Sequence, residues 1–410
     1  MTGTLQLPPE SESPWGAVLF LHGSGPQDRN ENNPRAPLNI FNTLAMDFVA
    51  AGLASLRYDK RGIGESSGDA LAASITDFAA DAREAVRFLR RMHETQGLPV
   101  FVLGHSEGAT IALMLAGQDA GIAGAILLCP TVTPMEEILR RQAVGVQVAI
   151  DRLPPGQRQT MGIPEGFDQR QATEQMIAAI RSAPAGQASI TFMNQPVPAG
   201  WFRSHFDLDH GAILERVRCP VLAVGGAKDA QVPPGDAEAI VAMLRHGAGG
   251  AARGGGEAAG GGTGIGATPV GGAGAGRGGT DGTAVAARRG AGAGGGAHGA
   301  EAGRAGAPQG EGTGATPARG AKPESGATPQ GGGAEGGGTG AKPEAGRVGA
   351  RDFTGVTIPD LTHVLRRSTG DGGVQEYGEM VQRPVDPGLR ALLVEWIQRH
   401  RPDGEEEAGA

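Results

Sequence analysis

The sequence predicts an α/β fold in which a mostly parallel central sheet is flanked by helices. Short, near-continuous apolar runs alternate with amphipathic stretches, which is typical of parallel strands covered on both faces. Glycine contributes 72 of 410 residues, but about 40 of these lie between Gly247 and Ala350. Roughly 300 residues of ordinary composition remain, which suits one large domain with an added lobe.

Seven apolar runs bounded by turn residues are the expected strands. They are Gly3–Leu7, Ala17–His22, Leu53–Tyr58, Val100–Gly104, Gly124–Cys129, Val221–Gly225 and Phe353–Ile358.

Helical periodicity fills most of the intervals. The clearest case is Asp77–His93, where apolar residues lie on one side and arginines on the other, with Asp77 as the expected N-cap. The other expected helices are Phe41–Ala51, Ala109–Ala116, Met135–Ala149, Glu174–Arg181, Asp236–Arg245 and Gly388–His400.

Two segments interrupt the alternation. Residues 131–215 contain amphipathic pieces and an aromatic cluster, and they are expected to form a helical lid over the carboxyl edge of the sheet. Residues 247–350 are rich in Gly and Ala and have almost no large apolar side chains, so a disordered insertion is predicted. The expected core is therefore split into residues 1–130, 216–246 and 351–402, followed by an acidic tail at 403–410.

Composition excludes several classes of function. The formal net charge of −8 argues against nucleic acid as a partner. The two cysteines, Cys129 and Cys219, cannot supply a disulfide framework or a four-ligand zinc site, and no metal or other cofactor is predicted. No apolar run approaches the ~18 residues of a membrane span, and residues 1–15 do not resemble a signal peptide. A cytoplasmic location without membrane partners is the expectation.

The strongest chemical motif is Gly104-His105-Ser106-Glu107-Gly108, between an expected strand and an expected helix. A strand that turns sharply into a helix crowds its neighbours, which explains a glycine on each side. The turn would project the Ser106 hydroxyl above the sheet edge, at a helix N-terminus that favours negative charge. Ser106 is therefore the predicted nucleophile.

A serine nucleophile needs a base and a group that orients it. Of nine histidines, His363 follows the last strand directly at its carboxyl end, whereas His22 and His105 lie in motifs where a structural role is expected. Asp229 occupies the same position after the preceding strand, Val221–Gly225. The chain order Ser106, Asp229, His363 is the order expected when such a serine turn opens the triad.

An acyl-transfer site also needs two donors for the oxyanion. The backbone N–H of Glu107 follows the nucleophile directly. The second donor is expected from the loop His22-Gly23-Ser24-Gly25, most naturally the Ser24 N–H, because Pro26 has no N–H.

These motifs resemble the α/β-hydrolase superfamily, specifically its serine-aminopeptidase-like and bacterial carboxylesterase-like branch. The likeness rests on HGSGPQDRN (22–30), RYDKRGIGESSG (57–68), GHSEGA, PVLAVGGAKDAQVPP (220–234) and DLTHVL (360–365), in the family's order. The family usually has a short connection where this chain carries the Gly/Ala-rich insertion. The resemblance implies a scaffold role for Asp59 and Arg61.

The leading expectation is a serine hydrolase that cleaves small carboxylic esters through an acyl-enzyme, with His105, Trp201 and Phe202 lining the substrate site. The alternatives are an aminopeptidase-like amide hydrolase, a thioesterase or acyltransferase, and a non-catalytic scaffold that uses the Gly-rich segment. An aminopeptidase would need an anionic site for the substrate's amine, for which Asp207, Asp209 and Glu215 are candidates. The sequence leaves the oligomeric state open.

Overall fold

A computed structural model describes residues 1–9, 13–33, 37–119, 121–253, 352–373 and 376–402. The chain divides into one unit of residues 1–257 and 348–410 and a second of 258–347. The predicted disordered insertion and acidic tail lie outside the described residues, apart from the stretch of the insertion up to residue 253, which continues a helix. The Gly-rich segment on which the scaffold alternative depends therefore also lies largely outside the described residues.

Within the described residues, the central sheet has seven strands in the order β1-β3-β2-β4-β5-β8-β9. Only β1 runs antiparallel to its neighbour, so the predicted, mostly parallel sheet is confirmed. Its strands are β1 (Gly3–Gln6), β2 (Gly16–Leu21), β3 (Leu53–Tyr58), β4 (Val100–His105), β5 (Ile122–Leu128), β8 (Val221–Gly226) and β9 (Phe353–Ile358).

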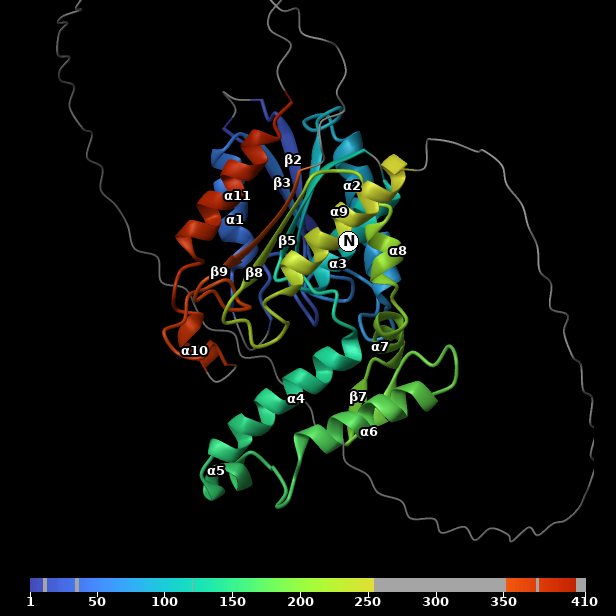
Figure 1. Cartoon of the computed structure of the whole chain (residues 1–410), viewed down its shortest axis with the longest axis vertical. Coiled ribbons are helices and arrows are strands. Elements are labelled where there is room, and N and C mark those ends of the chain that lie inside the picture. Colours follow the sequence, from blue (N-terminus) through green and yellow to red (C-terminus); the bar gives the residue numbers. More distant parts are fainter. Residues whose placement is uncertain (10–12, 34–36, 120, 254–351, 374–375, 403–410) are drawn as a thin grey trace, which may run out of the picture. The chain divides into compact units, whose positions relative to one another are not determined.

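Helices cover both faces of the sheet (Figure 1). One face carries α1 (Ile40–Ala50) and α11 (Pro387–Arg399), and the other carries α2 (Ile75–Arg91), α3 (Glu107–Gln118), α8 (His210–Leu214) and α9 (Asp236–Arg253). Side chains alternate between two apolar cores, because successive residues of a strand point to opposite faces. In β2, Val18 and Phe20 pack with α1 and α11, whereas Leu19 and Leu21 pack on the opposite side.

The N-terminus of α2 corrects one prediction. The helix begins at Ile75, and Ser74 rather than Asp77 is its N-cap. Ser74 Oγ accepts from the Asp77 N–H, while Asp77 Oδ2 accepts from the Ser74 N–H. Asp77 thus completes a capping box from inside the helix, a role that the same sequence pattern allows.

A lobe follows β5 and lies beyond the carboxyl ends of the strands (Figure 1). It contains α4 (Met135–Arg152), α5 (Pro155–Thr160), α6 (Gln169–Ser182), a small hairpin of β6 (Ile190–Phe192) and β7 (Gln195–Val197), and α7 (Ala199–Phe206). The short helix α10 (Tyr377–Met380) precedes α11. No helix in the described part of the chain is long and apolar enough to span a bilayer.

Candidate active site

Ser106 occupies a strained turn between β4 and α3. Its backbone has φ 55° and ψ −117°, a conformation that non-glycine residues rarely adopt and that is concentrated at functional sites. A Cβ on Gly104 would lie 2.0 Å from the Gly108 carbonyl oxygen, and a Cβ on Gly108 would lie 2.0 Å from the Leu21 carbonyl oxygen. Both glycines of the motif are therefore required by close backbone contacts, as the sequence indicates.

Asp229 and His363 meet at the carboxyl ends of β8 and β9. His363 Nδ1 lies 2.8 Å from Asp229 Oδ2, and both side chains are buried. The other carboxylate oxygen, Oδ1, accepts from the backbone N–H groups of Gln231 and Val232 at 2.8 and 3.0 Å. Burial alone would raise the pKa of Asp229, but His363 and these amides outweigh burial and lower the pKa. The carboxylate is thus ionised and fixed, with one oxygen directed at the imidazole.

Ser106 and His363 line one cavity of about 210 Å³, together with Gly23, Ser24 and His105. We call it the loop cavity. No hydrogen bond joins Ser106 Oγ to His363 within the described ranges, so the shared cavity is what relates the two side chains. Hydrogen bonds between a serine and its general base are commonly long or poorly aligned before substrate binds.

The two predicted oxyanion donors also lie beside Ser106. Ser24 lines the loop cavity, and Glu107 is the first residue of α3. Among the hydrogen bonds of the described residues, neither the Ser24 N–H nor the Glu107 N–H has a partner. Both amides are free to donate to a bound oxygen.

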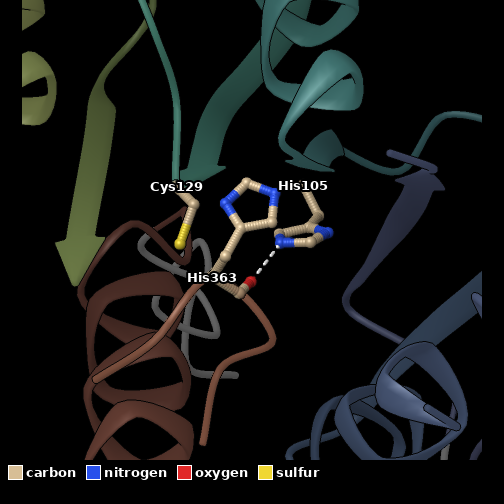
Figure 2. A group of neighbouring side chains, drawn as sticks. All are labelled: His105, Cys129 and His363. Atoms are coloured by element: carbon tan, nitrogen blue, oxygen red, sulfur yellow. Dashed lines mark hydrogen bonds between the residues drawn. The ribbon is translucent and has the colours of Figure 1, made fainter. Parts of the chain in front are cut away.

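Glu31 is a site residue that the sequence analysis did not single out. It is fully buried, and its Oε1 accepts from the Gly23 N–H at 2.9 Å and lies 2.7 Å from His105 Nδ1. His105 Nε2 in turn lies 2.8 Å from the His363 carbonyl oxygen (Figure 2). Burial opposes a positive charge on His105, yet Glu31 raises its pKa. His105 therefore bridges the loop at residues 22–25 and the His363 backbone, and it also lines the loop cavity.

Figure 2 also shows Cys129 beside the two histidines. One potential ligand atom from each of His105, Cys129 and His363 lies within 4.8 Å of the others. However, both nitrogens of His105 and the Nδ1 of His363 already have partners, and burial raises the pKa of the Cys129 thiol. A metal would need neutral imidazoles with free nitrogens and a thiolate, so these residues do not fit a metal site.

Glu107 connects the turn at Ser106 to the lobe through its side chain. Its carboxylate is buried, with Lys60 Nζ 2.6 Å from Oε1 and the Trp201 indole N–H donating to Oε2 at 2.5 Å. His205 Nε2 lies 3.4 Å from Oε2, outside good hydrogen-bond geometry. Burial would raise the pKa of Glu107, but Lys60 and His205 lower it to about 2.

A second cavity of about 210 Å³ lies on the lobe side of Ser106. We call it the lobe cavity. Its walls come from α3, α4, α7 and the loop after β8, and they include both aromatic residues that we expected there, Trp201 and Phe202. Its apolar lining consists mainly of Met135, Ile138, Leu139, Trp201, Phe202, Leu208 and Val232. Ser106 and Ser24 line both cavities.

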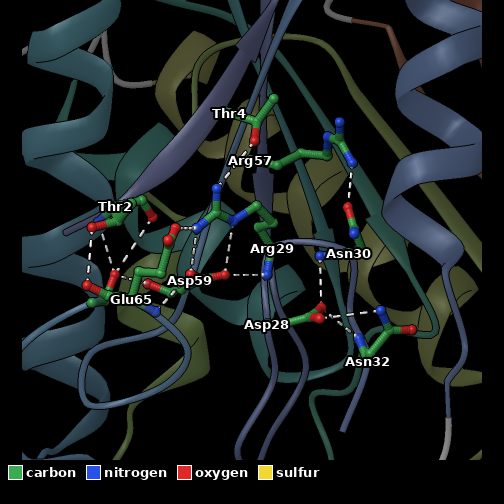
Figure 3. Close-up of polar contacts among 10 residues, drawn as sticks. Thr2, Thr4, Asp28, Arg29, Asn30, Asn32, Arg57, Asp59 and Glu65 are labelled. Carbon is green, nitrogen blue, oxygen red and sulfur yellow. Dashed lines mark hydrogen bonds and ion pairs between the residues drawn. The ribbon is translucent and has the colours of Figure 1, made fainter. Parts of the chain in front are cut away.

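Asp59 holds the segment that follows the loop at residues 22–25. Arg29 donates to both oxygens of Asp59, and the Arg29 guanidinium also pairs with Glu65 (Figure 3). Burial opposes ionisation of Asp59, but Arg29 lowers its pKa to about 2. Arg61 pairs with Asp81 on α2 at 2.7 Å. These contacts are structural and lie outside both cavities.

The three carboxylates considered for an amine site lie elsewhere. Asp207 is exposed and pairs with Arg181 at 2.7 Å. Asp209 caps α8 by accepting from the Ala212 N–H, and Glu215 is exposed at the end of that helix. None of them lines either cavity beside Ser106.

Comparisons with known proteins agree with this architecture. A family model described as serine aminopeptidase, S33, matches residues 14–248, more than half of the chain. Esterase EstD of Thermotoga maritima is 28% identical over 232 residues, which cover 56% of this chain and 50% of that protein. Human monoglyceride lipase is 31% identical over 122 residues, covering 29% of this chain and 36% of the lipase.

The chain thus spans at most about half the length of these two relatives. Among solved structures, Est1E from Butyrivibrio proteoclasticus with ferulic acid bound matches with a TM-score of 0.41 and 16% identity, covering 60% of this chain and 82% of that one. The fold is that of the α/β hydrolases, and the chain belongs to the serine aminopeptidase S33 family.

Proposed function

We propose that the protein is a serine hydrolase that cleaves small carboxylic esters through an acyl-enzyme. The observation that carries the proposal is the 2.8 Å contact between His363 Nδ1 and Asp229 Oδ2, at the cavity lined by the strained Ser106. This contact assigns the proton to His363 Nδ1, because an ionised carboxylate can only accept. Nε2 is then left as the base.

In the proposed reaction, Ser106 Oγ attacks the ester carbonyl carbon while His363 Nε2 takes its proton. The carbonyl oxygen becomes an oxyanion that accepts from the N–H groups of Ser24 and Glu107. The intermediate collapses, and His363 gives its proton to the departing alcohol. Water, deprotonated by His363, then attacks the acyl carbon and releases the acid and free Ser106.

The lining of the cavities supports an ester rather than a peptide amine as substrate. A free α-amine would need an unpaired carboxylate near the reacting carbonyl. In the described part of the chain, the carboxylates that line the two cavities are Glu107, paired with Lys60, and Glu31, paired with His105. The lobe cavity offers apolar walls for a small acyl group, and the loop cavity is left for the alcohol.

Ser106→Ala tests this proposal. We expect a fluorophosphonate probe to label the wild type at Ser106, and the variant to lose both labelling and p-nitrophenyl butyrate turnover while it stays folded by circular dichroism. Ser182→Ala, which changes an exposed serine at the end of α6, is the matched control and should keep wild-type rates. A folded wild type that is neither labelled nor active would overturn the proposal.

A panel of substrates then separates the chemical classes. The panel contains acetyl to octanoyl p-nitrophenyl esters, the matching thioesters and aminoacyl anilides. The same triad would hydrolyse all three classes, so the ratio of their kcat/KM values shows which class the enzyme prefers. We expect the short esters to be the best substrates. Anilides that outrank esters would instead favour the aminopeptidase alternative.

A further inference from the structure

Lys60, in the loop after β3, is a buried cation with a full set of partners. The residue is 4% exposed. Its Nζ donates to the Gly23 carbonyl oxygen at 3.0 Å and to Glu107 Oε1 at 2.6 Å, and it lies 4.2 Å from the centre of the Phe78 ring. An ammonium has three hydrogens, and these three partners account for them. The contacts therefore fix the position of the charge.

The Gly23 carbonyl belongs to the same peptide group as the Ser24 N–H. In a trans peptide the C=O and N–H point in opposite directions, so a bond that fixes the carbonyl also fixes the direction of the amide. The neighbouring Gly23 N–H is held by Glu31, and the Ser24 carbonyl accepts from the Gln27 side chain at 3.2 Å. Lys60 supplies a charge-assisted contact to the 23–24 peptide itself, and such bonds are stronger than neutral ones.

The same ammonium acts on the second donor, because it neutralises the side chain of Glu107. Without Lys60, a buried carboxylate would belong to the residue whose N–H faces the oxyanion, and like charges repel strongly in a dry site. The ion pair is 2.6 Å long, and its two side chains are 5% and 2% exposed. One cation therefore connects the residues that supply both donors.

We propose that Lys60 is a positioning residue of the oxyanion hole, orienting the Ser24 N–H through the Gly23 carbonyl and cancelling the charge of Glu107. The inference rests on the proposed ester hydrolase, since it concerns the oxyanion of that reaction. Its effect falls on the transition state, because the ground-state carbonyl carries little charge. Loss of Lys60 should therefore lower kcat and leave KM nearly unchanged.

The test is made without the Glu107 carboxylate, because Lys60→Met alone leaves that carboxylate buried and unpaired and can prevent folding. In Glu107→Gln, the Lys60 ammonium keeps the Gly23 carbonyl and the Phe78 ring as partners. The double variant Lys60→Met with Glu107→Gln is measured against Glu107→Gln alone, so that the loss of the carboxylate is common to both. A second double variant, Lys60→Met with Glu107→Leu, replaces the pair by apolar side chains in case the first is unstable. Arg390→Met, which breaks an ion pair with Asp47 between α11 and α1, is the control for losing a cation.

Removing one oxyanion donor costs ~10²–10³ in kcat, so misorienting one should cost about 10- to 100-fold. We expect the Lys60→Met double variants to lose this factor in kcat relative to Glu107→Gln, with KM within about threefold. The affinity for an alkyl trifluoromethyl ketone, whose hemiketal carries an oxyanion, should fall by the same factor as kcat/KM.

Folded double variants that match Glu107→Gln in kcat and in ketone affinity would overturn the inference, as would a rise in KM with kcat unchanged. Failure of the proposed function gives a different result: the wild type itself then neither turns over esters nor binds the ketone. The two failures are therefore distinguishable in one set of measurements.

Discussion

Replacing Asp229 by Asn tests the proposed roles of Asp229 and His363, because the existing contacts determine how the new amide would be oriented. Oδ1 accepts from the backbone N–H groups of Gln231 and Val232, so the Asn carbonyl oxygen must take that position. The Asn NH₂ group then faces His363 Nδ1 at the former 2.8 Å contact. An NH₂ group can only donate, so His363 must accept at Nδ1 and carry its proton on Nε2.

That tautomer cannot take the proton of Ser106, and the imidazolium formed during catalysis also loses its counter-ion. By analogy with the serine-protease triad, we expect kcat for p-nitrophenyl butyrate to fall ~10⁴-fold, which corresponds to about 5.4 kcal/mol in activation free energy. KM should change little. The fold should survive, because Asn keeps both backbone contacts, and the loss of unfolding free energy should be about 1–3 kcal/mol.

The matched control is Asp360→Asn, in the loop that leads to His363. Asp360 is half-exposed, and its contact with Lys228 lies outside both cavities. Its φ of 60° suits Asn as well as Asp, so activity should remain within twofold of wild type. A folded Asp229→Asn protein that retains more than a tenth of wild-type kcat would refute the assignment of the tautomer, and with it the role of Asp229.

Two further outcomes follow from the same geometry. Gly108→Ala should prevent folding or lower the melting temperature sharply, because its Cβ would lie 2.0 Å from the Leu21 carbonyl oxygen. Gly145→Ala, in open space on α4, should instead raise the unfolding free energy by about 0.5–1 kcal/mol. Thermal melts in which the two variants behave alike would contradict this expectation. The pKa of Glu107 is about 2 against an ordinary 4.5, so its contribution to stability is complete above pH 4.5 and disappears as pH falls through 2. Urea titrations should therefore show a shallower loss of stability in acid for Glu107→Gln, and an unchanged acid limb would argue against the Lys60–Glu107 pair.

The core strands could be predicted from sequence because each is buried on both faces and is therefore a continuous apolar run. The expected and observed bounds of the strand Phe353–Ile358 are identical, and Leu53–Tyr58 is the same in both. Ser106, Asp229 and His363 lie one, three and five positions after the ends of such strands. Their placement at one sheet edge needs only the parallel topology, which the alternation of strands and helices already indicates.

The lobe shows where local patterns are insufficient. Its hairpin turns at Met193 and Asn194, both with positive φ, without the Asn-Gly or Asp-Gly pair that usually identifies such a turn. Pro196 lies within β7, and a proline ordinarily argues against a strand. None of the six strand residues is buried, so the hairpin has no apolar run that a short sequence window could detect.

The supporting residues of the site were missed for a related reason. Glu31 acts on His105 across 74 positions of sequence, and Lys60 acts on Glu107 across 47. Each is an isolated charged residue in a loop, where exposure is the ordinary expectation. Lys60 does lie inside the RYDKRGIGES motif, between the predicted scaffold residues Asp59 and Arg61. That position was the one signal in the sequence that could have indicated a structural role for this lysine.

The charge at position 107 has a consequence for how the lobe and the nucleophile act together. At an effective dielectric near 20, two like unit charges a few ångströms apart repel by several kcal/mol, which is comparable with the contribution of one oxyanion donor. An unpaired carboxylate at Glu107 would therefore cancel the donor that its own backbone provides. Lys60 removes that penalty through Oε1, which leaves Oε2 to hold Trp201 of α7. Because Trp201 also lines the lobe cavity, the carboxylate couples the wall of the proposed acyl site to the nucleophile turn, and a change at residue 107 should alter acyl preference together with rate.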